Sequence, residues 1–98
     1  MTQVRLIIKN PRDPKRQEVG EFLVDSGAHY TVLPLEMVRK LKLKPSYEQD
    51  FSLADGKIIS RSIGGAVIRF EDRELPVPVV LGEKNDTGLL GVTTLESF

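Results

Sequence analysis

The sequence of 98 residues has no cysteine, no tryptophan and a single histidine, His29. Without cysteine, disulfide bonds, thiolate catalysis and cysteine-based metal sites are excluded. One histidine cannot build a metal site without several carboxylate ligands. We therefore expect neither a metal site nor a cofactor.

The sequence also lacks net charge, because 14 basic residues balance 14 acidic ones. A balanced chain has no electrostatic reason to bind nucleic acid or a membrane surface. No apolar run approaches the length of a membrane span, and the first residues carry no signal-peptide pattern. We expect a cytoplasmic protein with neither nucleic acid nor membrane as partner.

Short strand patterns fill most of the chain, which is long enough for one domain, residues 1–98. Residues 4–9 and about 17–24 form two of them, with proline-containing residues 10–14 as a break. Residues 51–53 and 57–62 flank an Asp-Gly pair, which is a strong hairpin signal. Gly64-Gly65 predicts a flexible or bulged point before a strand at 66–70. Residues 75–81 alternate with period two, with prolines on the outer face, which favours an edge strand.

Two helices are expected among these strands. Leu35, Val38 and Leu41 recur at helical spacing, and Pro34 suits the first helical position. Thr93 and Glu96 stand at capping-box spacing, which predicts the start of a terminal helix. The pattern predicts a mainly β domain closed into a small barrel, with one short mid-chain helix and a C-terminal helix.

The run from Phe22 to Ala28 carries the most chemical information. Three apolar residues lead into Asp25, so the carboxylate is expected half buried at the end of a strand, where its proton affinity can be unusual. Gly27 allows a sharp turn and the close approach of another chain. Asp-Ser-Gly is also ordinary turn chemistry, so this run alone does not define a catalytic site.

A single carboxylate is a poor catalyst of peptide hydrolysis. Two carboxylates in contact share a proton, so one can act as base toward water while the other acts as acid toward the carbonyl. A two-fold homodimer makes such a pair from one residue type. If Asp25 is catalytic, we therefore expect it to work in a homodimer.

Further segments follow this run in a fixed order along the chain. They are Thr31-Val32-Leu33-Pro34, Leu53-Ala54-Asp55-Gly56 and Leu89-Leu90-Gly91. With the Asp-Ser-Gly-Ala run, the series resembles the retropepsin-like aspartic protease family, which includes retroviral proteases. The run Ala-Asp-Gly-Lys-Ile resembles its prokaryotic branch. The resemblance implies an acid-protease-like barrel and an aspartic endopeptidase that acts on peptides or proteins.

The resemblance also implies roles for individual residues. Asp25 would be the catalytic aspartate, Ser26 would bond across the dimer, Gly27 would offer its carbonyl to substrate, and Ala28 would line a subsite. The segment 89–91 would pack beneath this active-site loop. The flap that closes over the substrate would contain Leu53, Ala54, Asp55 and Gly56.

The sequence departs from the family pattern in three places. Only Gly56 marks the flap turn, and His29 and Tyr30 stand where acidic residues are common. Family members usually add a strand after the terminal helix, so either the sequence is trimmed or the dimer uses other contacts, such as residues 1–4. Two alternatives stay open: a non-catalytic peptide-binding or dimerisation module of the same fold, and a small β scaffold in which Asp25 only caps a turn.

Overall fold

A computed structural model describes residues 2–98, and Met1, expected near the dimer contacts, lies outside the described residues. The described residues form one seven-stranded sheet and two helices. In chain order the elements are β1 (Gln3–Asn10), β2 (Asp13–Val24), β3 (Thr31–Leu33), α1 (Leu35–Leu41), β4 (Tyr47–Ser52), β5 (Ile58–Phe70), β6 (Arg73–Leu81), β7 (Leu89–Leu90) and α2 (Val92–Ser97).

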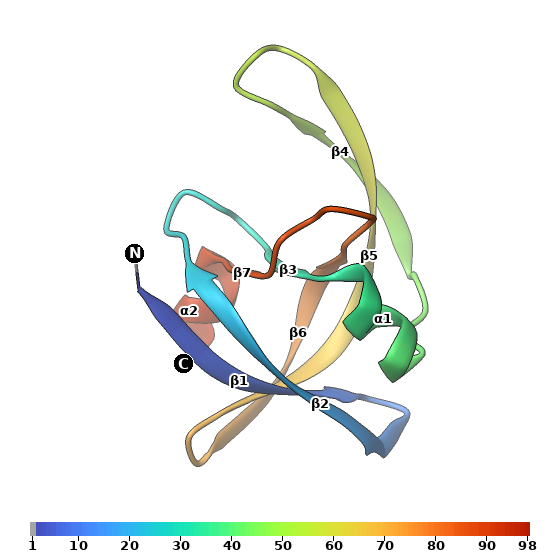
Figure 1. Ribbon diagram of the computed structural model, residues 1–98, viewed down its shortest axis with the longest axis vertical. Helices are drawn as coiled ribbons and strands as arrows, with labels where there is room; N and C mark the ends of the chain where they lie inside the picture. The colour runs from blue at the N-terminus through green and yellow to red at the C-terminus, as the bar shows by residue number, and fades with distance from the viewer. Residues whose placement is uncertain (1) are drawn as a thin grey trace.

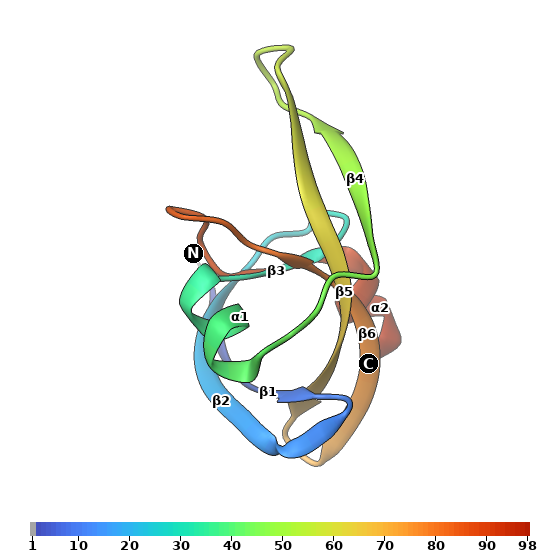
Figure 2. The same cartoon turned by 90° about the vertical axis from the view of Figure 1, so that its right-hand side faces the viewer.

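The strands are arranged as a closed ring with one hairpin outside it. The sheet order is β1-β2-β7-β3-β6-β5-β4, and β1 also pairs with β5, so the first six strands close on themselves. β4 pairs with β5 alone, and the β4–β5 hairpin stands away from the other strands (Figures 1 and 2). The expectation of a small, mainly β, acid-protease-like fold with two helices is confirmed.

The core fills the inside of the ring with apolar side chains. Alternation along β1, β2, β5 and β6 turns one face of each strand inward. The fully buried large side chains include Phe22, Leu6, Ile8, Leu33, Leu41, Ile63, Ile68 and Val79. As expected, the proline-containing half of β6 is a local edge, because β3 pairs with β6 only from Val79 to Leu81.

β2 begins at Asp13, earlier than the sequence pattern predicts. Asn10 pairs with Asp13, and its Oδ1 accepts a hydrogen bond of 2.8 Å from the Arg12 N–H, so the turn is tighter than expected. The next ladder pair is Lys9 with Gln17, which leaves residues 14–16 in a bulge. Pro14 is tolerated there because a bulged residue has no ladder hydrogen bond to donate.

The predicted bulge at Gly64-Gly65 is wrong, because β5 runs unbroken through both glycines and keeps its register with β6. Gly64 serves a different purpose. A Cβ at this position would lie 2.7 Å from the carbonyl oxygen of Lys44, so glycine allows the segment before β4 to cross close to the strand.

The predicted helix at 35–41 is confirmed, although Pro34 occupies the extended position before it rather than the first helical position. In α2, Gly91 takes the N-cap position without a side-chain cap, so the predicted capping box is wrong. The Thr93 hydroxyl instead donates to the His29 carbonyl at 2.7 Å. Within residues 2–98, neither helix has the length and apolar character to cross a membrane.

Candidate active site

Asp25 lies where β2 ends, and two neighbouring strands fix its position. β2 and β7 pair in parallel, Leu23 with Leu89 and Val24 with Leu90. The Asp25 N–H then donates to the Leu90 carbonyl at 3.0 Å. The backbone of this residue is therefore part of the sheet, while its side chain is half buried at the rim of the core.

The turn after Asp25 orients its carboxylate. The Gly27 N–H donates to Asp25 Oδ1 at 2.9 Å, and the Ala28 N–H donates to the Asp25 carbonyl at 3.1 Å. Within residues 2–98, the bond from the Gly27 N–H is the one hydrogen bond that the Asp25 carboxylate accepts, so Oδ2 is left for other partners. Ser26 and Gly27 are exposed at the tip of the loop. The Asp-Ser-Gly turn is therefore present, and it orients the half-buried carboxylate through one backbone N–H.

The start of α2 holds the other half of the loop. The Val92 N–H donates to the Ala28 carbonyl at 2.8 Å, and the Thr93 N–H donates to the His29 carbonyl at 3.0 Å. A side chain on Gly91 would collide with the backbone of Tyr30. Residues 89–91 therefore lie directly against the loop, in the position that the resemblance implies.

A buried polar pair supports this contact, and the sequence reasoning missed it. The hydroxyls of Thr31 and Thr94 lie 2.6 Å apart, and Thr31 Oγ1 accepts a hydrogen bond of 3.0 Å from the Gly91 N–H. Neither threonine is exposed. In the sequence, the neighbouring Thr93 had the spacing of a helix cap, whereas Thr94 matched no pattern. The sequence therefore gave no signal for the bond between Thr31 and Thr94.

A cleft of about 440 Å³ separates the active-site loop from the β4–β5 hairpin. Its walls are mostly apolar side chains from four separate parts of the chain. The lining residues are Gly27, Ala28, His29, Tyr30, Val32, Phe51, Ser52, Leu53, Ile59, Arg61, Val80, Asp86, Thr87 and Leu89. Figure 1 shows the corresponding ribbon segments, with the hairpin above the loop between β2 and β3.

The four residues predicted to form the flap divide into two groups. Leu53 lines the cleft, whereas Ala54, Asp55 and Gly56 form the exposed hairpin tip outside the lining. Gly56 has a φ of 86°, a conformation that glycine adopts without strain. The Leu53 N–H donates to the Lys57 carbonyl at 2.7 Å, which closes the hairpin below the tip.

Four cleft residues that were not predicted as site residues connect its walls. Arg61 of β5 bonds Asp86 through Nε at 2.8 Å and Glu83 through Nη1 at 2.8 Å. The hydrogen bond from Arg61 lowers the pKa of the Asp86 carboxyl and raises the pKa of the guanidinium. The Tyr30 ring meets the Phe51 ring edge to face, with centroids 6.2 Å apart. No local sequence pattern predicts these contacts, because each joins residues that are 21 or more positions apart in the chain.

His29 is exposed, and its ring packs against the Tyr30 ring with centroids 4.8 Å apart. The carbonyl of His29 holds α2, while its imidazole makes no hydrogen bond within residues 2–98. The same part of the chain contains no cluster of three or more histidine or acidic side chains that could hold a metal.

The ring of strands, the Asp-Ser-Gly loop and the overhanging hairpin define a retropepsin-like aspartic protease domain. A comparison with protein families matches residues 16–97 to the family described as "gag-polyprotein putative aspartyl protease", and the chain belongs to this family. No curated protein sequence matches the chain. Membership of the prokaryotic branch stays a prediction.

Proposed function

We propose that the protein is an aspartic endopeptidase whose catalytic pair consists of Asp25 from each of two identical chains. The observation that carries the proposal is the position of Asp25 at the end of β2, in a loop that orients its carboxylate through the Gly27 N–H and lines an apolar cleft with Gly27 and Ala28. Membership of an aspartyl protease family supports the same chemistry.

The proposed chemistry divides the work between two carboxyl groups that share one proton, as like charges in close contact require. The ionised carboxylate takes a proton from a water molecule, and the water oxygen attacks the peptide carbonyl carbon. The protonated carboxyl gives its proton to the carbonyl oxygen. When the C–N bond breaks, the amine leaves with the proton that the first carboxylate had taken, and one hydroxyl of the intermediate returns its proton to the second carboxylate as the carbonyl re-forms.

The proposed partner is a second copy of the chain. One chain supplies one Asp25, so the reaction needs an isologous contact that brings two loops together. The exposed loop tip at Ser26 and Gly27 supports this contact, because glycine permits close approach of backbones. In the dimer, Ser26 would bond across the two-fold axis.

The proposed substrate is a peptide in extended conformation. The cleft lies between the loop and a hairpin, so a peptide in it would run alongside backbone on both sides. Ala28, Val32 and Phe51 would surround an apolar side chain of the substrate, and Gly27 would offer its carbonyl to the substrate backbone.

The test replaces Asp25 with Asn and assays the cleavage of an unfolded protein at mildly acidic pH. We expect cleavage to be lost while the fold is retained. The matched control is Asp72→Asn in the exposed turn between β5 and β6, which should cleave like the parent. Equal cleavage by the Asp25→Asn variant and the parent would refute the proposal.

A second measurement distinguishes the proposed protease from the non-catalytic peptide-binding or dimerisation module. Specific activity should rise with protein concentration as dimers form, and a pepstatin-type transition-state mimic should inhibit it. A parent protein that binds peptides, forms dimers and cleaves nothing would support a peptide-binding module in place of a protease.

A further inference from the structure

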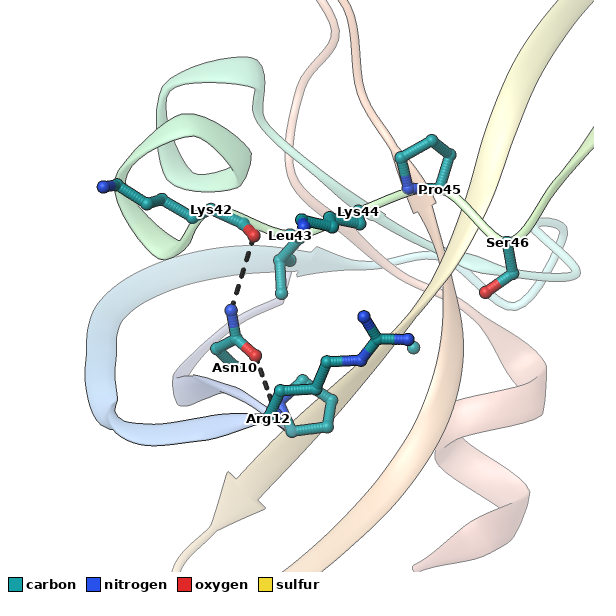
Figure 3. A pocket seen from close by; sticks show the side chains of 9 residues that line it. Asn10, Arg12, Lys42, Leu43, Lys44, Pro45 and Ser46 are labelled. Carbon is teal, nitrogen blue, oxygen red and sulfur yellow. Dashed lines mark hydrogen bonds between the residues drawn. The ribbon is translucent and has the colours of Figure 1, made fainter.

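A second cavity, of about 410 Å³, lies outside the cleft and shares none of its lining residues. It lies between the β1–β2 turn and the segment that leads from α1 to β4. Its lining consists of Asn10, Pro11, Arg12, Lys42, Leu43, Lys44, Pro45, Ser46 and Gly65. In Figure 3, the Arg12 side chain extends from the turn toward the segment with Pro45 and Ser46, whereas the Lys42 side chain points outward.

The backbone of Gly65 has hydrogen-bonding groups that face this cavity. Antiparallel strands exchange hydrogen bonds only at alternate residue pairs. Gly65 pairs with Pro78 of β6, and Pro78 has no N–H to donate. The bonded pairs are therefore those of Gly64 with Val79 and Ala66 with Val77, so the N–H and carbonyl of Gly65 point away from β6.

Within residues 2–98, no neighbouring strand bonds these groups on the other side. The pairing of β1 with β5 ends at Lys9 and Val67, and its continuation would place Pro11 opposite Gly65. The pairing of β4 with β5 ends at Tyr47 and Ile63, and its continuation would place Pro45 there. Neither proline can donate a hydrogen bond. Gly65 therefore occupies a gap in the strand pairing, with one free donor and one free acceptor.

The charge around the gap has one sign. Arg12, Lys42 and Lys44 line the cavity, and no acidic side chain of the described residues does. Within residues 2–98, none of these three side chains forms an ion pair, whereas six of the other eleven arginines and lysines do. The cavity thus combines unpaired positive charge with an unpaired backbone segment.

We propose that this cavity binds a short acidic segment of a partner protein, whose backbone bonds Gly65 while its carboxylates meet Arg12 and Lys44. A peptide fits better than a simple anion, because the exposed carbonyl of Gly65 can accept a hydrogen bond from a peptide N–H but would repel an anion. Proteins use the same kind of edge pairing when they bind extended peptides. The site would act independently of cleavage at Asp25.

The experiment titrates the isotope-labelled full chain with a blocked peptide of glycine and three glutamates and follows backbone amide signals by NMR. The control ligand has glutamine at each glutamate position. We expect saturable shifts of the Gly65 and Arg12 amides with the glutamate peptide only. Arg12→Ala should weaken binding by about tenfold or more, as loss of a charged hydrogen bond does. The exposed Arg5→Ala variant should bind like the parent.

A steric variant tests the location. A Cβ on Gly65 would meet only the Pro11 side chain, at 4.0 Å, so Gly65→Val should fold and block the cavity. Equal binding of the glutamine peptide, full binding by both Arg12→Ala and Gly65→Val, or equal shifts with inorganic phosphate alone would each overturn the proposal. Loss of binding with cleavage unchanged would separate this site from the proposed catalytic one.

Discussion

The hydroxyl oxygens of Thr31 and Thr94 lie 2.6 Å apart in the core, where neither residue is exposed to solvent. Thr31 begins the strand after the Asp25 loop, and Thr94 belongs to the terminal helix. Because Thr31 Oγ1 also accepts from the Gly91 N–H, one buried oxygen connects three segments around the loop. The loop that carries Asp25 therefore depends on a polar contact between distant parts of the chain.

Thr31→Val should destabilise the protein by about 1–3 kcal/mol, because it leaves the Gly91 N–H and the Thr94 hydroxyl buried without this partner. Urea unfolding at a fixed protein concentration measures the change. Thr93→Val is the matched control, because its hydroxyl bond to His29 is exposed and its loss should cost less. A Thr31→Val variant as stable as Thr93→Val would contradict this account.

Gly91→Ala should destabilise the protein by about 3 kcal/mol or more, because the added carbon would overlap the Tyr30 backbone, which can shift only with the loop. Thermal unfolding measures the effect, and any cleavage activity should fall with it. The control is Gly65→Ala, where the new carbon meets one proline side chain at 4.0 Å. Similar unfolding temperatures for both variants would refute the prediction.

The ion pair between Arg61 and Asp86 should make stability depend on acidity. The bond from Arg61 lowers the pKa of Asp86 in the folded state. The contribution of this ion pair to the free energy of unfolding is therefore present above the ordinary aspartate pKa of about 3.9. It fades as the pH falls through the lower pKa that Asp86 has in the folded state. Asp86→Asn should lower the free energy of unfolding by about 1 kcal/mol at pH 7, which is typical for the loss of a partly exposed ion pair.

Urea unfolding between pH 7 and strongly acidic pH tests this dependence. The difference in unfolding free energy between the parent and Asp86→Asn should shrink as the pH falls below about 4. Glu83→Gln is the control, because Glu83 pairs with the same arginine from a more exposed position. A difference that stays constant with pH would show that the charge of Asp86 does not stabilise the fold.

The hydroxyl of Tyr30 raises the pKa of Tyr47, at the base of the hairpin. Since the sequence contains only two tyrosines, Tyr30→Phe leaves Tyr47 as the one phenol to titrate. We expect Tyr47 in this variant to ionise at lower pH than in the parent, as phenolate absorbance would show. In the parent, Gln49→Ala tests whether the effect passes through the contact between Tyr30 and Gln49. An unchanged Tyr47 titration in Tyr30→Phe would show that the Tyr30 hydroxyl does not raise the pKa of Tyr47.

The sequence determined the elements whose signals are local. The helix from Leu35 to Leu41, the Asp-Gly hairpin and the alternating strand at 75–81 follow from periodicity and turn chemistry, which act between near neighbours. The order of motifs around Asp25 was sufficient to predict the family. Where local signals competed, prediction failed: Gly64-Gly65 looked like a bulge, and Thr93 looked like a cap.

Only the tertiary structure decided which distant residues meet. It placed residues 89–91 against the Asp25 loop, joined Thr31 to Thr94, and brought Arg61 of β5 to Asp86. It also showed that Gly64 is small because Lys44 crosses it, and that Gly65 faces a gap between two prolines. Such contacts depend on strand register and ring closure, which no local pattern encodes, because each is set by packing across the whole core.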